Sequence, residues 1–157
     1  MKLIATLLVA IIALTCLLIW QLNERAGVYF DDRCFGNVTY LDASDNALRF
    51  EGNVTFDFKK TNTGMFNLTG NIDYHENNYR LSRYISFTYD NVSGNQYRIN
   101  TTTKDIMAHD NVPAELLPLV TRIFGMEGEY TIYLHKNDNN FITIANALSP
   151  LINCVIQ

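Results

Sequence analysis

The chain has 157 residues, of which 12 are basic and 16 are acidic, so its formal net charge at pH 7 is −4. An acidic balance excludes proteins that bind nucleic acid through a basic face, because such faces neutralise phosphates with lysine and arginine. The length is suited to one domain with a hydrophobic core.

The first predicted element is an apolar helix at the amino terminus. Residues 3–20 form an aliphatic run, interrupted by two threonines and one cysteine, that begins at Leu3 and ends at Trp20. As a helix this run would be about 27 Å long, close to the thickness of the hydrocarbon core of a bilayer. We therefore predict a transmembrane signal-anchor over residues 1–22.

A cleaved secretory signal is the alternative to an anchor. It would have a shorter apolar region of about 7–15 residues and small residues at the cut site, but no Ala-x-Ala pattern follows Trp20. Lys2 precedes the run, while Glu24 and Arg25 cancel just after it, so the positive-inside tendency places the rest of the chain outside the cytoplasm. We favour an uncleaved anchor followed by a short stalk over residues 23–33.

Two cysteines lie at the two ends of the predicted exported domain, residues 34–157. Cys34 opens this domain and Cys154 nearly closes it, whereas Cys16 lies in the predicted anchor. Two cysteines in an oxidising compartment are expected to pair, so we predict a disulfide, with two separate buried thiols as the alternative. The three histidines have no ligand-like spacing with either cysteine, and we expect no metal site.

Alternating apolar and polar residues predict β-strands through most of the domain. Asn-rich and Gly-containing segments separate these runs and are typical of turns. Arg83 interrupts the apolar face of one strand, and nothing in the sequence explains it. The predicted strands are residues 34–41, 48–58, 66–74, 79–89, 96–102, 129–135, 141–145 and 151–156.

Residues 112–125 break the alternation and predict a short helix. Asn111 is the candidate cap, Pro113 lies in the first turn, Pro118 limits or kinks the helix, and Gly125 ends it. Short hairpin loops predict an antiparallel meander whose apolar faces must meet, either as a barrel or as a sandwich. The predicted fold is thus mainly β: an N-terminal transmembrane helix, then one lipocalin-like barrel or sandwich of about seven or eight strands with one short helix.

The predicted inner face of the two long strands 48–58 and 66–74 is rich in aromatic residues. Such a face could enclose an amphipathic ligand, although a barrel of about eight strands is usually filled by its own side chains. Gly52 and Gly70 mark either a sharp bend or bulge or simply tolerated glycine. The candidate cavity-lining residues are Leu48, Phe50, Val54, Phe56, Phe58, Phe66, Leu68 and Tyr74.

No catalytic motif accompanies this pattern: a nucleophile elbow, a P-loop, a dinucleotide-binding fingerprint and a zinc-protease motif are all missing from the sequence. We therefore expect no enzymatic activity, no catalytic residue and no cofactor; an envelope hydrolase is the least favoured class. Five Asn-x-Ser/Thr sequons would be glycan acceptors in a eukaryotic secretory protein, but the same spacing describes the solvent face of an amphipathic strand, which we favour. They begin at Asn37, Asn53, Asn67, Asn91 and Asn100.

Several features together form a recognisable layout. They are the N-terminal anchor, Cys34 at the first strand, the glycine-marked strands 48–58 and 66–74, the segment Val112-Pro113-Ala114-Glu115-Leu116-Leu117, and the closing Pro150-Leu151-Ile152-Asn153-Cys154. This layout resembles the FidL-like family of membrane proteins in enteric bacteria. The resemblance implies a single-pass protein of the bacterial inner membrane, with a cytoplasmic N-terminus and a periplasmic domain.

The resemblance also implies a partner. Genes of this family tend to lie beside transmembrane transcription regulators that look like the ToxR and CadC type. Such regulators often depend on a small companion similar in layout to ToxS or VtrC. We therefore expect a heterodimer in which this chain stabilises the regulator or co-senses an envelope signal, with a bile salt as a candidate ligand. The alternative is a secreted or anchored lipocalin-like binding protein that acts without a regulator.

Overall fold

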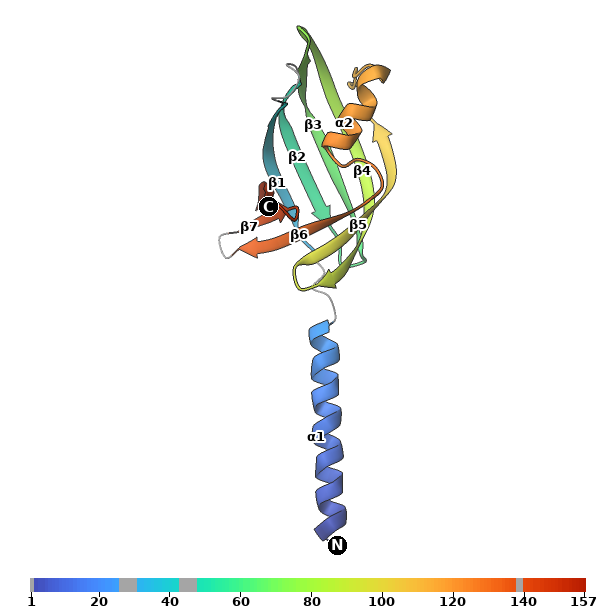
Figure 1. The fold of residues 1–157 in the computed structure, drawn as a ribbon, viewed down its shortest axis with the longest axis vertical. Coiled ribbons are helices and arrows are strands. Elements are labelled where there is room, and N and C mark those ends of the chain that lie inside the picture. Colours follow the sequence, from blue (N-terminus) through green and yellow to red (C-terminus); the bar gives the residue numbers. More distant parts are fainter. Residues whose placement is uncertain (1, 26–30, 43–47, 138–139) are drawn as a thin grey trace.

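In a computed structural model the chain forms an N-terminal helix and a closed antiparallel β-barrel (Figure 1). The structure describes residues 2–25, 31–42, 48–137 and 140–157. The described elements are α1 (Lys2–Arg25), β1 (Arg33–Leu41), β2 (Arg49–Phe58), β3 (Thr63–Tyr74), β4 (Asn77–Ser93), β5 (Gln96–Ile106), the 3₁₀-helix η1 (Ala114–Leu116), α2 (Leu117–Ile123), β6 (Glu129–Asn137), β7 (Phe141–Ala145) and β8 (Pro150–Ile156).

Helix α1 extends from Lys2 to Arg25, past the predicted anchor boundary at residue 22. Trp20 is 65% exposed, while the side chain of Leu3 lies outside the described residues. In the part of the chain that the structure describes, no helix meets the requirements of length and apolarity for a membrane span. Of the predicted stalk, residues 26–30 also lie outside the described part.

Each strand pairs antiparallel with its neighbour in sequence, and β8 returns to pair with β1. The alternation of the sequence explains this closure, because every strand has one apolar face to bury. In β2, for example, Phe50, Val54 and Phe58 are at most 2% exposed, while Arg49 and Asn53 face solvent. The predicted antiparallel β-fold is confirmed, and of the two predicted architectures the barrel is the one that forms.

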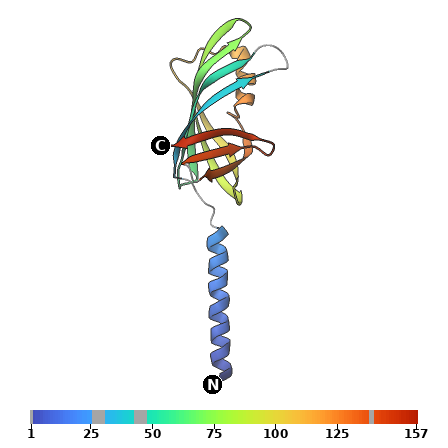
Figure 2. The ribbon, with the colours of Figure 1, turned by 90° about the vertical axis from the view of Figure 1, so that its left-hand side faces the viewer.

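The barrel is closed differently in its two halves. Within the described residues, β5 pairs with β6 from Gln96 to Asn100, and β8 pairs with β1 at Cys34 and Phe35. Strands β6, β7 and β8 therefore complete the wall in the half that includes the start of β1. In the other half η1 and α2 lie across the opening between β1 and β5 (Figures 1 and 2).

The short helical segment is confirmed, but its predicted cap is wrong. The side-chain oxygen of Asn111 accepts a hydrogen bond from the backbone N–H of Arg80, at 2.6 Å, and so ties the segment to β4 instead of capping a helix. Pro118 lies in the first turn of α2, where a missing N–H costs nothing. Gly125, with φ +57°, follows the helix in the left-handed conformation typical of helix ends.

Gly52 and Gly70 face each other across β2 and β3. A Cβ atom on Gly52 would lie 2.6 Å from the ring of Phe50 and 2.7 Å from the Cα atom of Gly70. The pairing of β2 with β3 is continuous through these residues, so they do not mark a bulge. They are also not simply tolerated, because the Phe50 ring lies where a side chain would be.

Candidate functional site

The residues predicted to line a cavity belong to the hydrophobic core or pack against it, and several of them pack against one another. The rings of Phe56 and Phe66 are 5.4 Å apart, and those of Phe58 and Phe87 are 5.7 Å apart. Leu48 and Leu68 are 1% and 2% exposed. Aromatic contacts of this kind stabilise the fold by more than the burial of their apolar area alone.

Helix α2 supplies an aromatic side chain to the same interior. The ring of Phe124, just after α2, lies 4.7 Å from that of Phe50 and 6.2 Å from that of Tyr40. Leu116 and Val120 are buried beside them. The helix therefore fills the half of the barrel that β6, β7 and β8 leave uncovered.

A buried ion pair explains Arg83. Its side chain is 10% exposed and that of Asp110 is 2% exposed, and the two form a bidentate pair with N–O distances of 2.5 and 2.9 Å. Asp110 also accepts hydrogen bonds from the backbone N–H groups of Ser82, at 2.9 Å, and Val112, at 3.2 Å. The pair thus fastens the segment that precedes η1 to the interior face of β4. The sequence indicated Arg83 through the broken pattern, but nothing in it indicated Asp110.

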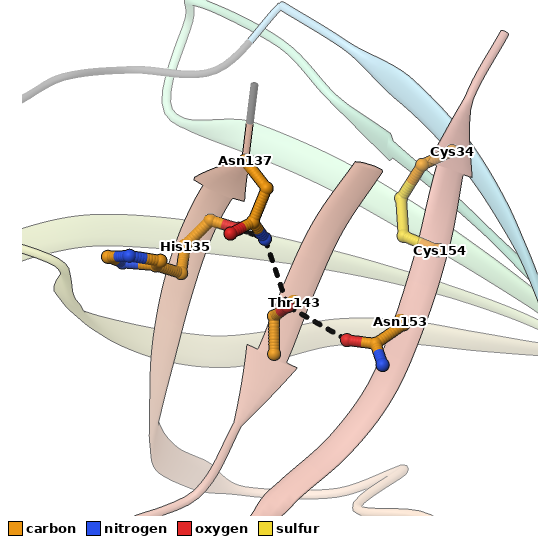
Figure 3. The surroundings of a disulfide bond; sticks show 6 residues. All are labelled: Cys34, His135, Asn137, Thr143, Asn153 and Cys154. Carbon is orange, nitrogen blue, oxygen red and sulfur yellow. Dashed lines mark hydrogen bonds between the residues drawn. A yellow bond between two sulfur atoms is a disulfide. The ribbon is translucent and has the colours of Figure 1, made fainter. Parts of the chain in front are cut away.

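The predicted disulfide forms between Cys34 and Cys154, whose Cα atoms are 5.3 Å apart. Both residues are fully buried and lie where β1 meets β8 (Figure 3). On the neighbouring strands Thr143 donates to Asn153 at 2.8 Å and accepts from Asn137 at 3.1 Å. These hydrogen-bonded side chains link β6, β7 and β8, and β8 carries Cys154 of the disulfide. His135, also shown in Figure 3, points away from the disulfide.

Three of the five sequons lie side by side on the outer face of β1, β2 and β3. Asn37 is paired with Asn53, which is itself paired with Thr69, while Thr55 is paired with Asn67. The central residues of these sequons point inward, and Val54 and Leu68 among them are 2% exposed. The amphipathic-strand interpretation therefore describes these three sequons.

An open groove of about 430 Å³ lies between α2 and β6. Burial raises the pKa of Tyr130, which lines it, to about 12. Glu127, on the groove margin, forms an ion pair with Lys104 of β5. All of its lining residues lie between Pro118 and Tyr130, and no sequence motif marks them. The other lining residues are Pro118, Thr121, Arg122 and Gly125.

A family model described as "FidL-like putative membrane protein" matches residues 70–154, more than half of the chain. The chain belongs to the FidL-like family. The match begins in β3 and includes most of the barrel, Asp110, α2 and Cys154. No curated protein matches this FidL-like chain.

The family match covers some of the features on which the resemblance rested. It includes Gly70, the segment 112–117 and the closing residues 150–154, whereas α1, Cys34 and β2 precede it. The structure brings Cys34 and Cys154 together at one closing point of the barrel. In this FidL-like protein the features of interest are therefore the disulfide-linked closure, the packed interior, and the opening that α2 covers.

Proposed function

We propose that this FidL-like protein is a periplasmic companion, anchored in the bacterial inner membrane, of a transmembrane transcription regulator of the ToxR or CadC type. In this role it stabilises the regulator or senses an envelope signal together with it. The N-terminus lies in the cytoplasm and the barrel lies in the periplasm.

The observation that carries the proposal is the Cys34–Cys154 disulfide, which joins the first strand of the barrel to the last. Disulfides persist in oxidising compartments such as the periplasm, which supports a location of the barrel outside the cytoplasm. The apolar run of residues 3–20 and the family's description as membrane proteins support attachment to the membrane.

The uneven closure of the barrel supports a companion role. In one half of the barrel, β6, β7 and β8 complete a hydrogen-bonded wall. In the other half, α2 covers the opening through side-chain contacts. Open strand edges favour pairing with another chain, which satisfies their backbone groups. A regulator with an exported domain is a partner that would reach this site from the same membrane.

The test is a pull-down of the tagged full-length chain from native membranes in a gentle detergent, followed by mass spectrometry. We expect one single-pass transcription regulator in near-stoichiometric amount. Recovery of the chain alone, at a detergent concentration that preserves other inner-membrane complexes, would show that the proposed function is wrong.

The eight-stranded barrel favours a second candidate, a lipocalin-like binder of an amphipathic molecule such as a bile salt. Because the interior is packed, the ligand would have to displace α2 and Phe124 from Phe50. Titration of the full-length protein with a bile salt would then quench or shift the fluorescence of a probe on α2. An unchanged signal up to the micellar concentration would count against this candidate.

A further inference from the structure

Within the described residues, one side of β1 is paired along its whole length and the other side is paired only near its start. Strand β1 pairs with β2 along its whole length, from Arg33 to Leu41. Its pairing with β8 consists of Cys34 and Phe35 in the described part of the chain. Gly36 still lies against Ile152, Asn153 and Cys154 of β8. Residues 37–41, which we name the β1 edge, therefore have a paired strand on one side alone among the described residues.

The hydrogen bonds at both ends of the β1–β2 ladder show which way the backbone groups point. The N–H of Phe58 donates to the carbonyl of Asp32 at 3.0 Å, and the N–H of Asp42 donates to the carbonyl of Leu48 at 2.9 Å. In an antiparallel ladder alternate residues bond to the same neighbour. Even-numbered residues of β1 thus direct their backbone groups to β2.

The odd-numbered residues direct their backbone groups to the opposite side. The bond from the N–H of Gln157 to the carbonyl of Arg33, at 3.0 Å, agrees with this. Beyond the contact with β8, three N–H and three C=O groups face the open side of the β1 edge. They belong to Asn37, Thr39 and Leu41.

The corresponding edge of β5 carries two features that hinder strand pairing, and the β1 edge carries neither. Where β5 parts from β6, a register shift follows Thr101, and Lys104 beyond it forms an ion pair with Glu127. Bulges and lysines are devices that keep an edge from pairing with another chain. The β1 edge, Asn37-Val38-Thr39-Tyr40-Leu41, has no charge and no proline, and its register with β2 has no shift.

We propose that the β1 edge binds an extended strand from the exported domain of the partner, an inference that rests on the proposed function. The guest strand runs antiparallel to β1, on the same side as β8 and beyond the end of the β1–β8 pairing. Its side chains alternate, because those of Val38 and Tyr40 are half-buried and those of Asn37 and Thr39 are exposed. The residues opposite the edge are uncharged, since β1 offers them no counter-charge.

A second copy of the chain fits this edge poorly. Two β1 edges that pair antiparallel are related by a two-fold axis perpendicular to the strands, so the start of one strand lies beside the end of the other. Seven residues separate α1 from β1, and they span at most about 25 Å, less than the roughly 30 Å of a nine-residue strand. The two helices would then leave from opposite ends, which is incompatible with anchoring in one membrane.

The test uses two variants of the full-length chain that carry the same charge change. Asn37→Lys with Thr39→Lys places two lysines on the β1 edge. Asn67→Lys with Thr69→Lys places them at the same spacing on β3, which is paired on both sides by β2 and β4. Both variants are first checked for the Cys34–Cys154 disulfide and for a wild-type melting temperature. Leu41→Lys, at a position 69% exposed, replaces the edge variant if it does not fold.

The measurement is the amount of regulator recovered in the pull-down from native membranes. We expect wild-type recovery with the β3 variant and at least a tenfold loss with the β1-edge variant. Undiminished recovery with the β1-edge variant would overturn the docking site and leave the companion function standing. Equal losses in the two variants would also overturn it, because the effect would then be one of charge alone.

A separate readout applies if the wild-type chain recovers no regulator, the result that removes the proposed function. Amide hydrogen exchange of residues 37–41 is then compared between native membranes and the purified full-length chain. Slow exchange in the membrane with fast exchange after purification supports a guest strand from another protein. Fast exchange in both samples overturns the inference, as does slow exchange in both with a mass that shows a dimer of this chain.

Discussion

At the scale of single residues, Gly52 and Gly70 are required by the close approach of β2, β3 and the Phe50 ring. We expect Gly52→Ala to lower the free energy of unfolding by about 1–3 kcal/mol, because the added methyl group forces apart atoms that are already in contact. Chemical denaturation of the full-length chain measures this loss. Asn53→Ala, at the next and exposed position of β2, is the control and should change stability by less than about 0.5 kcal/mol.

Arg83 and Asp110 form the buried ion pair that fastens the α2 segment to β4. We expect Asp110→Ala to lower the free energy of unfolding by about 3–5 kcal/mol, because it leaves the guanidinium of Arg83 buried and without its carboxylate. Asp32→Ala removes the exposed pair with Lys136 and should cost about 1 kcal/mol or less. Denaturation midpoints of the two variants measure these losses of stability. Equal losses would mean that burial does not set the strength of the Arg83 pair.

At the scale of elements, the join between β1 and β8 combines a short strand pairing with the disulfide. Cys34→Ser with Cys154→Ser removes a link between residues 120 apart in sequence. The expected loss is roughly 4–5 kcal/mol on the chain-entropy model. Hydrogen exchange should then accelerate first at residues 33–35 and 154–157, where the two strands meet. Uniform acceleration over all strands would instead show that the disulfide supports the barrel as a whole.

The stability of helix α2 depends on tertiary contacts, which the helical pattern of its sequence does not reveal. Its segment is short and begins after a proline, and its stability comes from Leu116, Val120 and Phe124 against the barrel interior. Isolated helices shorter than about 12–15 residues are marginal in water, so packing must supply the difference. The predicted cap at Asn111 was wrong because that side chain is used to bind β4.

At the scale of the whole molecule, the stability of the fold should fall at high pH. Burial raises the pKa of Tyr130 from 10.0 to about 12, so the folded chain holds this proton more tightly than the unfolded chain. The contribution of the Tyr130 proton to the free energy of unfolding is complete below about pH 10. It is lost as pH rises through the folded-state pKa, by about 2–3 kcal/mol in total. Unfolding measured between pH 9 and 12 should show a smaller loss for Tyr130→Phe than for the wild type; identical slopes would contradict this assignment.

Local sequence patterns were enough to predict the strands, the antiparallel class and the disulfide of this FidL-like protein. Alternation and turn residues act over a few neighbours, so 48–58 and 129–135 could be recognised without knowledge of the rest. The pairing of Cys34 with Cys154 was predicted from the number of cysteines outside residues 1–22 and from the expected oxidising compartment.

How the barrel closes and what its openings contain depend on contacts between segments that are distant in sequence. Arg83 and Asp110 lie 27 residues apart, and Phe50 and Phe124 meet across the interior. Among the described residues, β8 pairs with Cys34 and Phe35 of β1 and not with the whole strand. These outcomes follow from the packing of distant segments, which local pattern does not encode, and they create the β1 edge on which the proposed partner would dock.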